Sequence, residues 1–221
     1  GRAVEKANTA NLGVLAFNKA DAATTVSVTM ELASAAGVRV FATGGVGGVH
    51  RGYGEHLDIS ADLAAFTRFP VAVVASGTKS LLDVESTREA FETLGVPVIG
   101  FRCDRFPAFY LRESDAGVDA RFDDEEALAA FLAAELARTG RGVLVCNAIP
   151  EADEIGRADW ENWLAGAQRE AEGSAGRDVT PAVLGALHRV SGGATMRANL
   201  SLVRSNARLA GRLAALMPAR A

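Results

Sequence analysis

Short, almost uninterrupted apolar runs recur along the chain, and they constrain its fold more than any other feature. A strand that is covered by helices on both faces has no solvent-exposed face, so its sequence shows a continuous apolar run in place of alternating apolar and polar residues. The run at 71–75 is the clearest of these, and it ends in a small-residue turn. The expected strands are 38–42, 71–75, 96–101 and 142–146.

Helical segments separate these runs. The pattern predicts helices at 22–37, 59–69, 86–94 and 123–139. Strand and helix therefore alternate at least three times, which indicates βαβ units and a mostly parallel sheet covered by helices. The residues from 151 to the end read as largely helical, with a linker at 173–177, and we treat 1–221 as a single domain.

Bulk properties exclude several classes of protein. The chain has 221 residues, a formal net charge of −4 and two cysteines. The negative balance argues against a broad nucleic-acid surface. No apolar run is long enough for a bilayer, and no signal peptide is visible, so we expect no membrane partner and a cytoplasmic location. Cys103 and Cys146 read as buried free thiols.

A glycine-rich segment follows the first expected strand. Residues 43–52 read TGGVGGVHRG, which matches neither the dinucleotide fingerprint nor a Walker A loop. Glycines let backbone N–H groups approach an anion, and Thr43, His50 and Arg51 add a hydroxyl and charge, so we expect phosphate binding here. The alternative is a mobile surface turn.

Two carboxylates and a lysine follow. Asp58 and Asp62 have the spacing of a helix face or of a loop ligand and a first-turn acid, and their oxygens suit Mg²⁺ or Mn²⁺. A helix cap plus a solvated acid is the alternative. Lys79 follows a buried strand, at the sheet edge where ligands gather, and a lysine with a lowered pKa can form a Schiff base. Its alternative is an exposed lysine at a helix start.

Two amides, Asn199 and Asn206, lie one heptad apart on the last expected helix. They form either a buried pair or a binding pair, and the sequence favours a structural role.

Taken in order, these segments resemble the pseudouridine-5′-phosphate glycosidase family. The resemblance runs from about Ala22 to the C-terminus. It is carried by 41–52 (FATGGVGGVHRG), 58–63 (DISADL), 71–83 (VAVVASGTKSLLD), 106–114 (FPAFYLRES), 147–151 (NAIPE), 179–181 (VTP), 191–194 (SGGA), 198–199 (AN) and 206–207 (NA).

The resemblance implies an α/β/α sandwich with a helical C-terminal part, a homotrimer, and an enzyme that cleaves the C–C glycosidic bond of pseudouridine 5′-phosphate to uracil and ribose 5-phosphate. Its partner is thus a small phosphorylated nucleoside, and its cofactor is a divalent metal, commonly Mn²⁺. By resemblance, Lys79 is the Schiff-base nucleophile and Asp58 the metal ligand. The substrate contacts are Lys6, Val26, Thr43, His50, Ser60, Ala61, Asp62 and Asn199.

The family's N-terminal segment carries a glutamate proton donor. No counterpart precedes Lys6, so we expect an N-terminally truncated chain.

Two further functions stay open. The same residues would serve a C-glycosynthase that joins ribose 5-phosphate to another aromatic acceptor. A non-catalytic homologue that binds a sugar phosphate is the third possibility.

Overall fold

The core of the protein is a five-stranded sheet in which every pairing is parallel. The computed structural model describes residues 4–170 and 179–218, so the expected linker at 173–177 lies outside the described residues. The strand order is β3-β4-β7-β5-β6. The strands are β3 (Val40–Ala42), β4 (Ala72–Ala75), β7 (Val143–Cys146), β5 (Val98–Phe101) and β6 (Ala120–Phe122).

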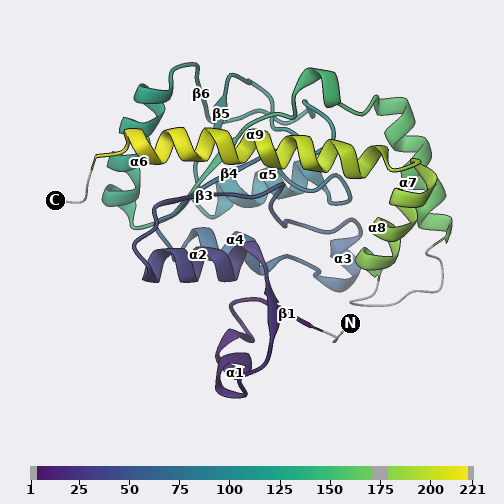
Figure 1. Cartoon of the computed structure of the whole chain (residues 1–221), viewed down its shortest axis with the longest axis horizontal. Helices are drawn as coiled ribbons and strands as arrows, with labels where there is room; N and C mark the ends of the chain where they lie inside the picture. The colour runs from purple at the N-terminus through teal and green to yellow at the C-terminus, as the bar shows by residue number, and fades with distance from the viewer. Residues whose placement is uncertain (1–3, 171–178, 219–221) are drawn as a thin grey trace.

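Helices cover both faces of this sheet, which confirms the predicted α/β sandwich (Figure 1). On one face, Val73 and Ala75 pack with α2 (Val26–Ala35), α4 (Ala61–Phe66) and α5 (Val84–Thr93). On the other face, Ala72 and Val74 pack with α6 (Glu125–Thr139) and α9 (Ala194–Leu216). Successive side chains of a strand point to opposite faces, so the continuous apolar run of β4 fills both cores.

The C-terminal part is helical, as the sequence predicts. The 3₁₀ turn η1 (Glu151–Asp153) leads to α7 (Arg157–Glu170), α8 (Val179–Val190) and α9. Trp160, Leu164 and Leu187 form a third core with the first half of α9. Figure 1 shows α9 running along the sheet from this helical corner toward the C-terminus.

Side-chain caps set where several helices begin. The carboxylate of Asp83 accepts from the N–H of Ser86, and that of Asp124 accepts from Ala127. Each bond satisfies one of the donors that a helix start leaves free. Gly140 ends α6 in the left-handed region, where glycine carries no steric cost.

A small unit precedes the sandwich. Strand β1 (Glu5–Ala7) pairs in parallel with β2 (Ala22–Thr24), and α1 (Leu12–Phe17) connects them and projects from the body (Figure 1). The predicted helix at 22–37 is therefore too long, because its first residues form β2 and α2 begins at Val26. Strand β6 was not predicted, since its residues are mostly exposed at the sheet edge. Within the described residues, no helix has the length and apolarity needed to cross a bilayer.

The third core provides a matched stability test. Leu202 and Leu200 lie on the same helix, but Leu202 is fully buried whereas Leu200 is 54% exposed. We expect Leu202→Ala to lower the free energy of unfolding by about 2–5 kcal/mol through the cavity it leaves. Leu200→Ala should change it by no more than about 0.5 kcal/mol. Urea denaturation measures both, and equal losses would contradict this packing.

Candidate active site

Two segments that hold predicted site residues, the glycine-rich segment and the turn with Lys79, begin at the carboxyl-terminal edge of the sheet, where β3 and β4 end side by side. Beyond the strands the two chains stay paired, because the N–H of Val46 donates to the carbonyl of Gly77 (3.0 Å) and the N–H of Lys79 donates to that of Val46 (3.2 Å). The glycine-rich segment and Lys79 are thus held together. In open α/β sheets this edge is where ligands bind.

Lys79 is reached by solvent and yet has a perturbed ammonium group. Burial lowers its pKa, the carboxylate of Asp62 opposes this by raising it, and the nearby charge of Lys6 lowers it again. Solvent reaches the Lys79 side chain, yet enough protein surrounds its ammonium group to disfavour the charged form. A lowered pKa increases the neutral, nucleophilic fraction of the amine.

Asp62 connects the segments around this amine. The residue is buried, and its Oδ1 accepts from the N–H of Ser27 (2.8 Å) while its Oδ2 accepts from that of Gly47 (2.8 Å). Its own N–H donates to Oγ of Ser60, the cap of α4 (3.2 Å). One carboxylate thus fixes the start of α2, the glycine-rich segment and the start of α4, and it places negative charge beside Lys79.

This arrangement brings together several of the residues that the resemblance assigns to substrate. Lys6, Asp62 and Lys79 interact through their charges. Val26 directly precedes Ser27, whose N–H donates to Asp62. Ser60 caps α4, and Ala61 is the first residue of that helix. Lys6 and Asp62 thus lie near the amine, and Asp62 links it to the segments that hold Val26, Ser60 and Ala61.

Close packing explains why residues in this segment are glycines. A Cβ on Gly45 would lie 2.6 Å from Cδ2 of Phe109, and one on Gly47 would lie 2.7 Å from Oδ2 of Asp62. A Cβ on Gly48 would collide with Thr87. The protein's own side chains therefore occupy the space beside three of these glycines, so any larger residue would collide with them.

Several N–H groups of this segment are also engaged. Those of Val46, Gly47 and Val49 donate to Gly77, Asp62 and Thr87. Phosphate binding at this segment stays a prediction, and it rests on the hydroxyl of Thr43 and on His50 more than on a backbone cradle.

Asp58 and His50 lie at the far end of the glycine-rich segment. The N–H of His50 donates to the carbonyl of Asp58 (3.0 Å), and Nδ1 of His50 lies 3.5 Å from Oδ2 of Asp58. The Asp58 side chain is 63% exposed. Among the described residues no three His, Cys, Asp or Glu side chains converge as a metal cluster. A hard divalent ion that keeps most of its waters and binds one carboxylate still fits this group.

Asn206 has the structural role that the sequence favours. Its fully buried amide donates to the carbonyl of Thr43 (2.8 Å) and to Oγ of Ser76 (3.2 Å), and accepts from Nδ2 of Asn147 (2.9 Å). The ends of β3, β4 and β7 are thereby tied to α9. Asn199 is half-buried one heptad earlier, and its Oδ1 lies 3.3 Å from the point where a Cβ of Gly44 would be.

Sequence reasoning missed that residues 106–111 form part of this site. They lie against the turn 76–80, with the N–H of Phe109 donating to the carbonyl of Ser76 (2.9 Å) and Oγ of Ser80 donating to that of Ala108 (2.7 Å). Gly77 has φ +66°, and a Cβ there would collide with the carbonyl of Pro107. The aromatic motif around Pro107 could have pointed to this contact. It was not used because it has no amphipathic period and therefore predicts only a loop.

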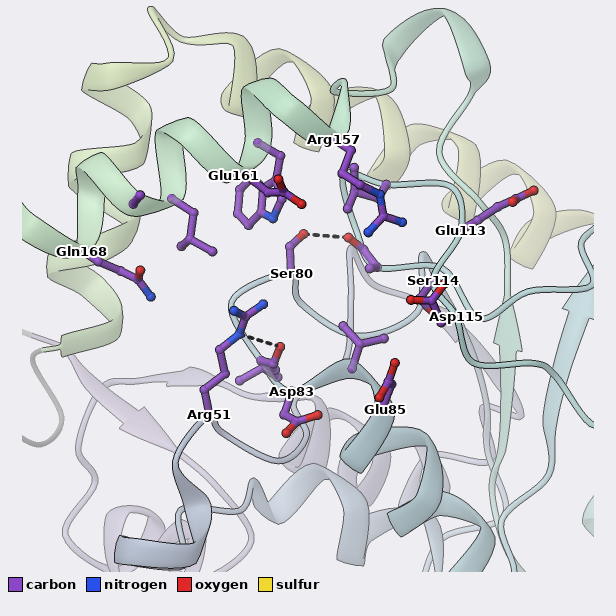
Figure 2. Close-up of a pocket in the computed structure, with 17 residues that line it drawn as sticks. Arg51, Ser80, Asp83, Glu85, Glu113, Ser114, Asp115, Arg157, Glu161 and Gln168 are labelled. Atoms are coloured by element: carbon purple, nitrogen blue, oxygen red, sulfur yellow. Dashed lines mark hydrogen bonds between the residues drawn. The ribbon is translucent and has the colours of Figure 1, made fainter.

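A cavity of about 560 Å³ lies beside this turn and is lined in part by Ser80 and Ala108 (Figure 2). Its described lining includes Ser80 but not Lys79. Two guanidinium groups, of Arg51 and Arg157, face an excess of carboxylates in this lining. The carboxylates are those of Asp83, Glu85, Glu113, Asp115 and Glu161. Such a lining disfavours a phosphate, so the candidate site is the surface around the Lys79 amine and not this cavity.

Fold and site together define an α/β protein with a desolvated amine at the carboxyl edge of its sheet. The chain belongs to the family described as Indigoidine synthase A like protein, whose model matches residues 1–216.

Curated relatives are similar over most of the chain. It is 50% identical over 194 residues to a pseudouridine-5′-phosphate glycosidase of Methylobacterium nodulans, with 86% of this chain and 58% of the relative covered. It is 45% identical over 207 residues to one of Myxococcus xanthus, with 92% and 68% covered. The chain thus spans little more than half the length of the first relative and about two thirds of the second.

Two solved structures share the fold. The prealnumycin C-glycosynthase AlnA, in complex with ribulose 5-phosphate, has a TM-score of 0.91 at 39% identity, covering 98% of this chain and 72% of that one. An indigoidine synthase A-like protein of Thermotoga maritima has a TM-score of 0.87 at 36% identity, covering 96% and 70%.

The tight contact at Gly77 leads to a stability prediction. Gly77 and Gly37 both have positive φ, but nothing lies within 4 Å of a Cβ on Gly37. Gly37→Ala should cost about 1–2 kcal/mol, the price of a left-handed residue with a side chain. Gly77→Ala must also displace the Pro107 backbone, so we expect a loss above about 3 kcal/mol in chemical denaturation. Equal losses would show that residues 106–111 do not lie on the turn.

The lysine cluster leads to a titration prediction. We expect the Lys79 ammonium to titrate below the ordinary lysine value of about 10.4, because burial disfavours its charged form. In Asp62→Asn the pKa should fall further, since the carboxylate that favours the charged form is gone. NMR of ¹³C-methylated lysines measures both values, and Lys79→Arg assigns the resonance. A Lys79 pKa at or above the ordinary value would contradict the desolvation of this amine.

Proposed function

We propose that this chain carries the catalytic part of an enzyme that reversibly cleaves the C–C glycosidic bond of pseudouridine 5′-phosphate to uracil and ribose 5-phosphate. The observation that carries the proposal is the desolvated amine of Lys79, beside Asp62 and Lys6 at the carboxyl edge of the sheet. The similarity to curated glycosidases that act on this nucleotide supports it.

Cleavage of a C–C glycosidic bond needs an electron donor at C1, because the base has no heteroatom at the bond to protonate and must leave with the electron pair of the bond. In the proposed reaction the Lys79 amine bonds to C1 of the ribose as the bond between C1 and the ring oxygen breaks, and the proton that the nitrogen loses ends on that oxygen as a hydroxyl. The nitrogen lone pair then forms an iminium as the bond to the base breaks, and C5 of uracil takes a proton. Water hydrolyses the iminium to release ribose 5-phosphate and the free amine.

The neighbours of Lys79 suit these steps. Lys6 favours the neutral amine and offers positive charge to a phosphate, while Asp62 holds the surrounding segments at fixed positions. Val26 begins α2, whose N-terminal end carries partial positive charge. Fixing the reacting carbon near the amine removes much of the entropic barrier. In this proposal Thr43, His50, Ser60, Ala61 and Asn199 complete the substrate contacts.

A divalent metal, Mn²⁺ or a similar ion, is part of the proposal. Asp58 would hold it, with His50 alongside and water or substrate oxygens as the other ligands. When bound it would neutralise negative charge on the phosphorylated substrate. A cytoplasmic homotrimer is also a proposal, carried by the family resemblance alone.

A second candidate function is C-glycoside synthesis. The high structural similarity to a prealnumycin C-glycosynthase favours it. The same amine would form the iminium with ribose 5-phosphate, and a carbon of a different aromatic acceptor would add to it.

One experiment separates these functions. The chain is incubated with pseudouridine 5′-phosphate and Mn²⁺, and uracil and ribose 5-phosphate are quantified, with Lys79→Arg as the control. Release of both products by the parent chain alone supports cleavage. Product formation only from ribose 5-phosphate and a non-uracil acceptor supports the synthase. Ribose 5-phosphate binding without turnover supports a non-catalytic homologue.

The metal proposal has its own test. Asp58→Asn should weaken Mn²⁺ binding at least tenfold, on the order of 1.4 kcal/mol, because it removes the single carboxylate of the site. Glu126→Gln, on the exposed side of α6, is the matched control and should leave affinity unchanged. Water-proton relaxation enhancement measures bound Mn²⁺ directly. Unchanged affinity in Asp58→Asn would place the metal elsewhere.

A further inference from the structure

The backbone of Phe109 adopts a conformation that a bulky residue rarely takes. Its φ is +61°, in the left-handed region that favours glycine. A non-glycine residue there costs free energy and persists only where its surroundings hold it. Such residues concentrate at ligand-binding and catalytic sites.

The surroundings that hold Phe109 are the residues on either side of Lys79. The N–H of Phe109 donates to the carbonyl of Ser76 (2.9 Å). Oγ of Ser80 donates to the carbonyl of Ala108 (2.7 Å) and accepts from the N–H of Tyr110 (3.4 Å). Phe109 is therefore fixed against the five-residue turn that contains the proposed nucleophile.

Neighbouring groups fix the Phe109 ring in place and leave part of it open. One side lies on the backbone of Gly44 and Gly45, where a Cβ would come within 3.1 Å and 2.6 Å of it. Tyr110 packs edge-on at 4.7 Å between centroids, and Tyr110 in turn contacts Trp160 at 5.3 Å. The Phe109 side chain is only half-buried. A rigid aromatic surface at a ligand site is suited to stacking.

A polar group lies beside this ring. The point where a Cβ of Gly44 would be is 3.1 Å from Cε2 of Phe109 and 3.3 Å from Oδ1 of Asn199. An aromatic ring with an amide nearby is a common way to bind a nucleobase, which has a flat π surface and a polar rim. The charged cluster of Lys6 and Asp62 is beside Gly47, further along the same segment.

We propose that Phe109 is a specificity-determining residue whose ring stacks on the planar aglycone, so that the site selects nucleotides with a flat heteroaromatic leaving group. This inference rests on the proposed function. The Phe109 ring carries no charge and no hydrogen-bond donor, so it offers nothing to the phosphate or the ribose hydroxyls. It offers dispersion and quadrupole attraction to a flat base, and these act equally on cleavage and synthesis.

The test compares the affinity for the base with that for the sugar. Uracil is titrated by NMR into the chain with saturating ribose 5-phosphate, and ribose 5-phosphate is titrated separately. Phe109→Leu should weaken uracil about fivefold or more, the scale of base–aromatic stacking, and change ribose 5-phosphate less than about twofold. Phe109→Tyr should keep the parent affinity for uracil. Phe122→Leu, another half-buried ring in an aromatic pair, is the matched control and should change neither affinity.

A second measurement needs no variant. In the parent chain, ring current from a stacked phenyl group should shift the H6 resonance of bound uracil upfield. Bound uracil without that shift, or equal loss of both ligands in Phe109→Leu, overturns the inference and leaves the proposed function intact. A parent chain that binds neither uracil nor ribose 5-phosphate overturns the proposed function, and the inference fails with it.

Discussion

The contact between Gly77 and the carbonyl of Pro107 is the constraint on which the site depends. The turn after β4 is left-handed at Gly77, and the segment 106–111 lies directly on it. Hydrogen bonds from Phe109 to Ser76 and from Ser80 to Ala108 close the contact on both sides of Lys79. The desolvated amine of Lys79 is thereby carried on a backbone that has little freedom, as the proposed nucleophile would need in order to meet one carbon of a substrate.

Two buried polar residues extend this rigidity outward. The amide of Asn206 ties α9 to the ends of β3, β4 and β7, and the carboxylate of Asp62 ties the starts of α2 and α4 to the glycine-rich segment. Each is satisfied by several hydrogen bonds, so its burial is not penalised as an unpaired group would be. Asp62 has a second effect, because its charge partly offsets the desolvation of Lys79.

The sequence was sufficient to predict the elements with strong local signals. The apolar run at 71–75 became β4, and the helix predicted at 123–139 became α6 (Glu125–Thr139). Strand β6 was not predicted because an exposed edge strand has no apolar run. The helix predicted at 22–37 begins too early because its first residues pair with β1, a contact that the local sequence does not reveal. Phosphate binding at the glycines stays a prediction, and their close packing against Phe109, Asp62 and Thr87 is a long-range contact that the local sequence does not reveal.

The central claim is that Lys79, and no other amine, reacts with the sugar. The chain has three lysines, at 6, 19 and 79, so one peptide map can assign the nucleophile. The chain is incubated with ribose 5-phosphate, reduced with borohydride, digested and analysed by mass spectrometry. The account predicts a reduced adduct on Lys79 alone. An adduct spread over all three lysines, or absent from Lys79 in the folded chain, would contradict it.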